Sequence, residues 1–298
     1  MNPTSLRLLR IPLSIAAVWA ALAFVVPDLM SRYAPYVTRP GFTCARTTIF
    51  TATGPVLPPG SCRHLSDLYG VPFNELFIDS AFRSLALLSG AAVLALTLGT
   101  LLGVAGGFWR QRAYVSGGIV GATTLLMAVP SFFVAYFLQI GVIAIGASKD
   151  TRDHLLPVYG FGYDDHIVLP LIAISLPAIA YTAQLTATRL AEVLDADFIT
   201  AARAKGLRMS WILVVHALPH VRPVILEALG SGLRVSVASL PIVEYLFLWR
   251  GIGQLALEAV GVQDIAGFTF PAIIFATLFV ALSALADLSR PKALYRTA

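Results

Sequence analysis

Residues 84–109 read SLALLSGAAVLALTLGTLLGVAGGFW, a run of 26 residues without a charged side chain. A helix of about 20 apolar residues crosses the hydrocarbon core of a bilayer, so this stretch predicts a membrane span. Four other uncharged stretches are of comparable length: 11–27, 113–148, 167–188 and 265–286. The sequence therefore indicates a helical membrane protein and argues against a water-soluble domain.

The composition of the whole chain agrees with that interpretation. Of 298 residues, 57% are hydrophobic and 12% are charged, whereas soluble domains carry about 25% charged residues. A sixth stretch, 223–248, is apolar except for Glu227, Arg234 and Glu244, which are costly in a membrane and therefore of functional interest. We predict an all-α fold, a bundle of six transmembrane helices forming a single domain over residues 1–298, with no room for a separate nucleotide-binding domain.

The distribution of charge predicts the orientation, because cytoplasmic segments carry an excess of Lys and Arg. One set of segments holds twelve of the 21 Lys and Arg and has a net charge of +8; the other holds eight and has a net charge of −2. We assign the first set to the cytoplasm: 1–10, 110–112, 189–222 and 287–298. We assign the second set to the outside: 28–83, 149–166 and 249–264. Both termini are then expected in the cytoplasm.

The first predicted span, 11–27, also has features of a secretory signal peptide. It follows basic residues and contains small residues at Ala20, Ala21 and Ala23. Its apolar run is longer than the roughly 7–15 residues usual in a signal peptide, and cleavage would leave five spans and an external N-terminus. We therefore expect a retained helix.

Both cysteines, Cys44 and Cys62, lie in the segment 28–83. A disulfide between them would stabilise this loop by about 3 kcal/mol in the chain-entropy treatment, and two free thiols are the alternative. A metal site would need more ligands than His64, the one histidine nearby, can supply. We expect no bound metal.

Three prolines, Pro130, Pro177 and Pro241, lie inside predicted spans. Each removes a backbone hydrogen bond and favours a kink. Such a kink can serve in opening and closing a gate; the alternative is that these prolines have no such role, because proline is common in membrane helices. The uncharged stretch 113–148 is too long for one perpendicular span and too short for two spans and a turn. We expect one tilted helix with interfacial ends.

The most informative segment, 189–222, connects the fourth and fifth spans on the side assigned to the cytoplasm. Asp195 or Asp197 can cap a short helix, and Gly206 can follow its last turn in the left-handed conformation that ends many helices. A second helix is expected to begin at Ser210. The product is a basic helix–turn–helix elbow, a shape suited to docking.

The second helix of the elbow should extend toward Pro219. His216 and His220 stand four residues apart, as two metal ligands on one helix face can. Pro219 lies between them and no His-Glu-x-x-His pattern is present, so we favour a surface or docking role.

The elbow carries a spaced pattern. Residues 200–202 read Thr-Ala-Ala, three residues precede Gly206, and nine more precede His-Ala-Leu-Pro at 216–219. This spacing resembles the coupling loop of the permease subunits of bacterial ATP-binding-cassette (ABC) importers, Glu-Ala-Ala–three–Gly–nine–Ile-x-Leu-Pro. Thr and His at the substituted positions resemble the dipeptide, oligopeptide and nickel subfamily, in the first of its two permease types. The resemblance assigns ATPase coupling to Thr200, Ala201, Ala202, Arg203, Lys205, Gly206, His216, Leu218 and Pro219.

A second pattern follows the fifth span. Residues 244–253 read Glu-Tyr-Leu-Phe-Leu-Trp-Arg-Gly-Ile-Gly, which resembles the subfamily's external segment, Glu-x-x-Phe-x-x-Pro-Gly-x-Gly. Arg250 departs from the pattern because it stands where proline is expected. The resemblance implies an external gate at Glu244, Gly251 and Gly253.

The resemblance covers about residues 73–290 and implies a set of partners in the bacterial cytoplasmic membrane. These are a second homologous permease, two cytoplasmic ATPase subunits or domains and an extracytoplasmic substrate-binding protein, with lipid around the spans and no nucleic acid. The implied activity is uptake of a small solute, foremost di- or oligopeptides and alternatively nickel, by alternating access. The sequence contains no Gly-Lys pair and so no phosphate-binding loop of that type. ATP and Mg are therefore expected on the partner ATPases, with no cofactor or catalytic residue on this chain.

Polar residues inside the spans are candidates for a solute pathway. Glu227, Ser231 and Arg234 share one helical face, and Arg234 could offer paired donors to a solute carboxylate. A salt bridge to another helix and a misplaced span boundary are the alternatives for Arg234. Gln184 belongs to a hydroxyl-rich part of the fourth span, for which helix packing is the alternative. A secondary transporter or a channel is the alternative function, because six kinked helices suit either.

Overall fold

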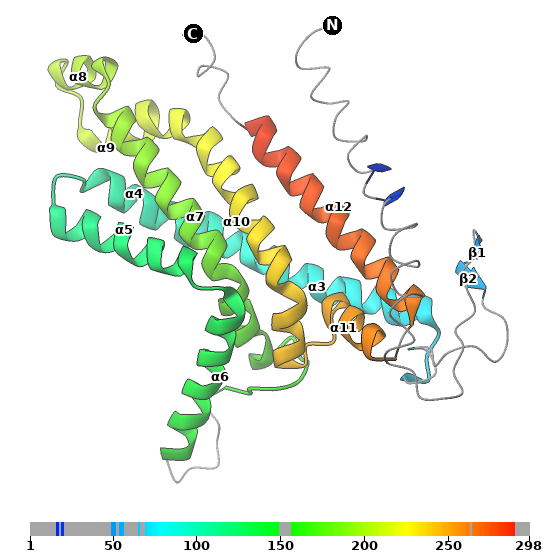
Figure 1. The fold of residues 1–298 in the computed structure, drawn as a ribbon. Coiled ribbons are helices and arrows are strands. Elements are labelled where there is room, and N and C mark those ends of the chain that lie inside the picture. Colours follow the sequence, from blue (N-terminus) through cyan, green and yellow to red (C-terminus); the bar gives the residue numbers. More distant parts are fainter. Residues whose placement is uncertain are drawn as a thin grey trace, which may run out of the picture. The chain divides into compact units, whose positions relative to one another are not determined.

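A computed structural model describes residues 16–17, 19–20, 49–51, 54–56, 65, 69–148, 156–262 and 264–289. Within these residues the regular secondary structure is helical apart from one short hairpin, in which β1 (Ile49–Thr51) pairs antiparallel with β2 (Gly54–Val56) (Figure 1). The helical fold predicted from the sequence is confirmed, with the hairpin as an addition in the segment 28–83.

Most of the described chain lies in helices of eight or more residues. In chain order these are α3 (Phe73–Leu94), α4 (Thr100–Phe108), α5 (Ala113–Ala128), α6 (Ser131–Ser148), α7 (Val168–Leu194), α8 (Asp197–Ala204), α10 (Leu218–Phe247), α11 (Ile252–Val262) and α12 (Ile265–Ser289). Shorter helical pieces are a 3₁₀ turn (Asp165–Ile167), α9 (Met209–Trp211) and two π-helical turns (Ala95–Gly99 and Ile212–Ala217).

Four described helices are long and apolar enough to cross a membrane: Phe73–Phe108, Asp165–Leu194, Met209–Phe247 and Gly267–Ser289. They correspond to the second, fourth, fifth and sixth predicted spans. The third corresponds to α5 and α6, which together pass the same test. The first, 11–27, lies almost entirely outside the described residues and stays a prediction, although Trp19 within it donates a 2.9 Å hydrogen bond from Nε1 to Oγ1 of Thr277 in α12.

The expectation of a single tilted helix over 113–148 is wrong. The helices α5 and α6 meet at an angle of 100° (Figure 1). Val129 adopts an extended conformation, with φ −89° and ψ 120°, because the ring of Pro130 disfavours the helical conformation in the residue before it. Pro130 also has no N–H to continue the hydrogen-bond ladder of α5. The bend is therefore a helix break, larger than the predicted kink.

The chain forms two compact units, which we describe one at a time. The first comprises Met1–Ala86, Pro157–His166 and Leu240–Ala281. The second comprises Leu87–Leu156, Ile167–Ser239 and Leu282–Ala298.

In the second unit, α7 packs against α4 through a row of glycines. Gly99, Gly103 and Gly107 recur every four residues and so lie on one helix face. A Cβ at Gly103 would stand 2.5 Å from Cβ of Thr186 and 2.7 Å from the carbonyl oxygen of Ala183, so the glycine backbone packs directly against α7 and leaves no space for a side chain. Small residues in this spacing let membrane helices approach closely.

The same helix, α7, also contacts α10 in the second unit. A Cβ at Gly232 would stand 2.5 Å from the Cα of Ala178, and Oγ of Ser236 donates a 2.7 Å hydrogen bond to the carbonyl oxygen of Ile174. Pro177 lies within this part of α7 and leaves the helix continuous. The fourth span is accordingly the most buried of the four.

In the first unit, the start of α12 is capped by a buried aspartate. The carboxylate of Asp264 accepts hydrogen bonds from the backbone N–H groups of Gly267, at 2.9 Å, and of Leu65, at 3.1 Å. Leu65 packs with Leu255 and Ala259 of α11 in a small apolar cluster. One carboxylate thus satisfies a free amide at a helix N-terminus and anchors a distant residue of the segment 28–83.

Candidate functional site

The predicted elbow is present in the second unit, where its first helix, α8, ends as predicted. Gly206 has a φ of +76°, a left-handed conformation that glycine adopts without steric cost. Its N–H donates to the carbonyl of Arg203 at 2.9 Å, and the N–H of Leu207 donates to the carbonyl of Ala202 at 3.4 Å. These two bonds form a Schellman motif, which satisfies the carbonyls left free at a helix C-terminus. The prediction for Gly206 is confirmed.

The predicted cap at the start of α8 is wrong. The N-cap residue is Ala196, and no side chain hydrogen-bonds to the first turn. Asp197 lies inside the first turn, where its charge interacts favourably with the helix dipole. Asp195 instead forms an ion pair with Arg110, from the connection between α4 and α5. The elbow is therefore tied to the second cytoplasmic segment of the charge-based assignment.

One predicted docking residue is buried within the unit. Ala202 is 7% exposed and packs in an apolar cluster with Ile199 of α8, Ile212 and Leu190. Of the residues that the resemblance assigns to coupling on this helix, Ala202 is therefore turned away from any partner, whereas Thr200, Ala201, Arg203 and Lys205 are exposed. Ala202 is small because the elbow folds against the membrane helices.

The second helix of the elbow does not stop near Pro219. It begins at Met209, one residue before the predicted start, and continues to Phe247 as one helix that includes the fifth span. The π-helical turn Ile212–Ala217 ends two residues before Pro219. A π-turn widens the helix by one residue, and such turns occur where a regular backbone hydrogen-bond ladder is interrupted.

The imidazole of His220 in the elbow contacts other parts of the chain. Nδ1 of His220 donates a 2.8 Å hydrogen bond to the carbonyl of His216, and its ring lies 5.0 Å from the ring of Phe198 in α8. Among the described residues, no group of three or more His, Cys, Asp or Glu side chains could hold a metal ion.

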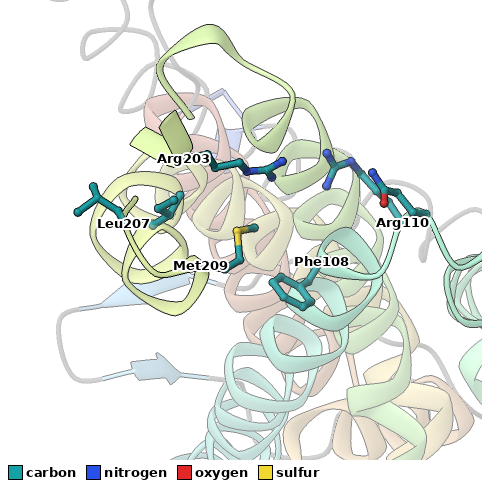
Figure 2. Close-up of a pocket in the computed structure, with 7 residues that line it drawn as sticks. Phe108, Arg110, Arg203, Leu207 and Met209 are labelled. Atoms are coloured by element: carbon teal, nitrogen blue, oxygen red, sulfur yellow. The ribbon is translucent and has the colours of Figure 1, made fainter. Parts of the chain in front are cut away.

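A cavity of about 360 Å³ lies beside the elbow (Figure 2). The two chain segments around it, 110–112 and 189–222, are both assigned to the cytoplasm by their charge. The side chains of Arg110 and Arg203 point toward one another, with Met209 and Phe108 below them. The complete lining is Phe108, Arg110, Gln111, Arg203, Leu207, Met209 and Ile212.

The second candidate site, in the first unit, is built around Glu244. Its side chain is fully buried and accepts hydrogen bonds from Oγ of Ser84 at 2.5 Å and from the backbone N–H groups of Gly253 at 2.7 Å and Gln254 at 3.2 Å. These two amides belong to the first turn of α11, where free N–H groups and the helix dipole favour a negative charge. Glu244 therefore joins the end of α10 to the start of α11.

The glycines that follow are required by space. A Cβ at Gly251 would overlap the carboxylate of Glu244, and a Cβ at Gly253 would stand 2.5 Å from the Cα of Pro241. The predicted gate residues Glu244, Gly251 and Gly253 are thus in direct contact, although their role as a gate stays a prediction. Ser84 belongs to the same cluster, and the sequence pattern gave no sign of it because it lies 160 residues from Glu244.

Arg250 has a conformation that proline cannot adopt. Its φ is +57°, whereas the proline ring fixes φ near −65°. Its N–H, which proline lacks, donates a 2.7 Å hydrogen bond to Oε1 of Gln254. Leu248 is also left-handed, with a φ of +55°. The departure from the family pattern at Arg250 therefore changes the shape of the turn.

A cavity of about 380 Å³ opens at this turn. It draws on all three segments that the charge distribution assigns to the outside: 28–83, 149–166 and 249–264. Its lining consists of Tyr69, Gly160, Phe161, Leu248, Arg250 and Gln254. Each of the two cavities thus gathers segments assigned to one side of the membrane.

The candidate pathway residues lie in the second unit. Arg234 donates hydrogen bonds to Oγ of Ser231 at 2.9 Å and to Oγ of Ser283 in α12 at 3.3 Å, so the predicted shared face of Ser231 and Arg234 is confirmed. Nε2 of Gln184 lies 3.5 Å from Oγ1 of Thr124. Glu227 is half-buried. A pathway role for these residues stays a prediction, as does the disulfide, since Cys44 and Cys62 lie outside the described residues.

Comparison with known proteins places these features in context. Residues 95–295 match the family described as "Binding-protein-dependent transport system inner membrane component". The probable peptide ABC transporter permease of Sinorhizobium fredii is 27% identical over 74% of this chain and 70% of its own length. The metal-staphylopine import permease of Staphylococcus aureus is 26% identical, over 75% and 69%, and the glutathione transport permease of Salmonella typhimurium is 24% identical, over 72% and 68%.

Proposed function

The chain belongs to the family of inner-membrane components of binding-protein-dependent transport systems. On that premise we propose that it imports peptides and that the import is driven by an ATPase that docks on the elbow. It is a multi-pass permease subunit of an ABC importer, and so a transport component and not an enzyme. This membership decides against the alternative of a secondary transporter or channel.

The observation that carries the proposal is the elbow. A short helix ends at Gly206, and its exposed residues include Thr200, Ala201 and Lys205, while its other face is buried on the second unit. A helix fixed on one side and free on the other presents a defined surface to a partner. We propose that this surface docks one of two cytoplasmic ATPase subunits or domains, which hold ATP and Mg.

The elbow is also built to convey motion. The helix Met209–Phe247 carries the elbow at its start and Glu244 near its end. Since Glu244 is bonded to the first turn of α11, a displacement of this helix would act on the external turn. We propose that ATP-driven movement of the elbow opens and closes the external segment at Glu244, Gly251 and Gly253, in an alternating-access cycle with a second homologous permease.

The solute class is proposed from the relatives. The relatives named above are a probable peptide permease, a glutathione permease and a metal-staphylopine permease. Glutathione is itself a small peptide. Peptides therefore have the broadest support, and delivery by an extracytoplasmic binding protein follows from the family. We further propose that both termini lie in the cytoplasm, as the charge distribution predicts.

The docking proposal is tested by placing a charge on either face of α8. Ala201→Asp alters the exposed face and should leave assembly of the complex unchanged while abolishing the stimulation of ATP hydrolysis by the loaded binding protein. Ala202→Asp is the matched variant, since it buries a charge in the apolar cluster and should lower the yield of folded complex instead. Both yield and ATP hydrolysis are measured on purified complex.

Normal stimulation and uptake in a correctly assembled Ala201→Asp complex would show that the ATPase docks elsewhere. Loss of assembly in both variants would assign the exposed face to permease folding.

A further inference from the structure

The cavity at the external turn contains one cationic side chain, that of Arg250. We propose that this cavity is a subsite for the carboxylate of the transported peptide, with Arg250 as the group that binds it. The inference rests on the proposed function, which it extends by naming a position on this chain where the solute is recognised.

The guanidinium of Arg250 is available to a ligand. Arg250 is exposed, and no ion pair or side-chain hydrogen bond involves its guanidinium in the part of the chain that the structure describes. One turn along α11 from Gln254 stands Glu258, whose carboxylate is already bonded to Tyr69 and Gln254. None of the six residues that line the cavity is acidic.

The backbone at Arg250 is held in an unfavourable conformation. A left-handed φ costs a non-glycine residue on the order of 1 kcal/mol, and the surrounding structure must maintain it. Gln254 does so through both ends of its amide, since Oε1 accepts from the N–H of Arg250 and Nε2 donates to Glu258 at 2.8 Å. Gln254 therefore positions the backbone of Arg250, and both ends of its amide are already hydrogen-bonded within the chain.

The hydroxyl of Tyr69 is likewise committed. It donates to Glu258, and burial, followed by this hydrogen bond, raises the pKa of Tyr69 to about 12, while the charge of Arg250 acts in the opposite direction. The phenol therefore stays protonated at neutral pH. Its ring forms a wall of the cavity, and the donors of Arg250 remain for a ligand.

Phe161, another residue of the lining, belongs to a cluster of aromatic contacts and hydrogen bonds. The guanidinium of Arg83 lies 4.0 Å from the centroid of the Phe161 ring, and the centroids of the Phe161 and Trp249 rings are 4.9 Å apart. The N–H of Gly160 donates to the carbonyl of Phe247 at 2.9 Å, and Nε1 of Trp249 donates to the carbonyl of Arg83 at 3.1 Å. A site fixed in advance loses little conformational entropy when a ligand binds.

The size and chemistry of the cavity fit one end of a peptide. Its volume of about 380 Å³ is near the lower end of the range for small-molecule sites. A guanidinium binds a carboxylate through two parallel hydrogen bonds. The aromatic walls and Leu248 suit the side chain of the residue that carries the carboxylate.

The test uses the complete importer in nanodiscs without its binding protein, because the binding protein would contribute its own recognition of the solute. The probes are dialanine and dialanine amide, which differ only in the carboxylate. Arg250→Gly removes the cation and tolerates the left-handed φ, and Arg250→Lys keeps the charge without the paired donors.

We expect wild type to bind dialanine more tightly than its amide. Arg250→Gly should weaken dialanine binding about 10-fold to 100-fold and leave amide binding unchanged, and Arg250→Lys should fall between them. Equal affinity of wild type for both probes, no binding of either, or an unaltered preference in Arg250→Gly would overturn the subsite.

Stimulation of ATP hydrolysis by the binding protein, measured in the same nanodiscs, separates this inference from the proposed function. If wild type shows no stimulation, the proposed function fails whatever the probes do. If stimulation is normal and Arg250→Gly binds dialanine as wild type does, the subsite alone fails. If Arg250→Gly loses stimulation but keeps its preference for dialanine, the cavity receives an acidic side chain of the binding protein, which also overturns the subsite.

Discussion

Glycine serves different purposes at the two candidate sites. At the elbow, Gly206 has a φ of +76°, and a Cβ placed there would meet nothing within 4 Å. At the external turn, Gly251 and Gly253 have no left-handed backbone, and a Cβ at either would collide with Glu244 or Pro241. The elbow needs glycine for its conformation, and the external turn needs it for space.

The same external turn places non-glycine residues, Leu248 and Arg250, in the left-handed conformation. At the external turn, Leu248 and Arg250 therefore adopt the strained backbone conformation, and Gly251 and Gly253 allow the close packing. At the elbow, Gly206 is needed for its backbone conformation alone. A spaced glycine pattern can thus conceal two physical causes, and substitutions distinguish them.

The largest effect is expected for Gly251→Ala. Its methyl group would overlap a buried carboxylate that three hydrogen bonds hold in place, so the turn must distort at a cost of about 1–3 kcal/mol or more. The thermal midpoint of the purified complex should fall and its yield decrease. Gly261→Ala is the control, because that glycine lies in the same helix, α11, with open space around it. A midpoint equally low in both variants would remove the crowding argument.

A smaller effect is expected at the elbow, where the variants Gly206→Ala and Gly206→Asn can be compared. Alanine in a left-handed conformation costs on the order of 1 kcal/mol, and asparagine tolerates that conformation better. Complex should assemble in normal yield with both, while stimulated ATP hydrolysis should be reduced with alanine and closer to wild type with asparagine. The conformational role of Gly206 is refuted if asparagine impairs coupling as much as alanine does.

The smallest effect is expected for Tyr69→Phe, which bears on the external turn only. The folded-state pKa of Tyr69 is raised to about 12, so its contribution to stability is complete below the ordinary tyrosine pKa near 10 and is lost as the pH rises through 12. At pH 7 the variant lacks one hydrogen bond, worth about 1 kcal/mol. Between pH 10 and 12, thermal unfolding of Tyr69→Phe should depend less on pH than that of wild type, and identical profiles would contradict the assignment.

The sequence predicted those features whose causes are local. The end of α8 depends on backbone bonds among residues 202–207, and Gly206 alone indicated it. Pro130 indicated a kink, but the angle between α5 and α6 also depends on how each helix packs, so the 100° bend was not predicted.

Features that depend on distant contacts were missed. Ala202 was assigned to docking by the sequence pattern, although it is buried. Its burial was missed because it depends on Ile212 and Leu190, which no local pattern connects to Ala202. The contact of Ser84 with Glu244 could not be inferred for the same reason. By contrast, the four-residue spacing of Gly99, Gly103 and Gly107 was visible in the stretch 84–109, and it is the one signal that could have predicted the contact between α4 and α7.

The π-helical turn at Ile212–Ala217 sets the rotational phase of the elbow relative to the span that follows. An α-helix advances about 100° per residue, and a π-turn accommodates one extra residue in a wider turn, so the residue count that defines each helix face is offset by one residue between its two sides. A single helical wheel drawn across Met209–Phe247 would therefore superpose faces that do not coincide. A permease whose helix were regular at this turn would therefore need one residue fewer between Gly206 and His216 to present the same side of its elbow to the ATPase.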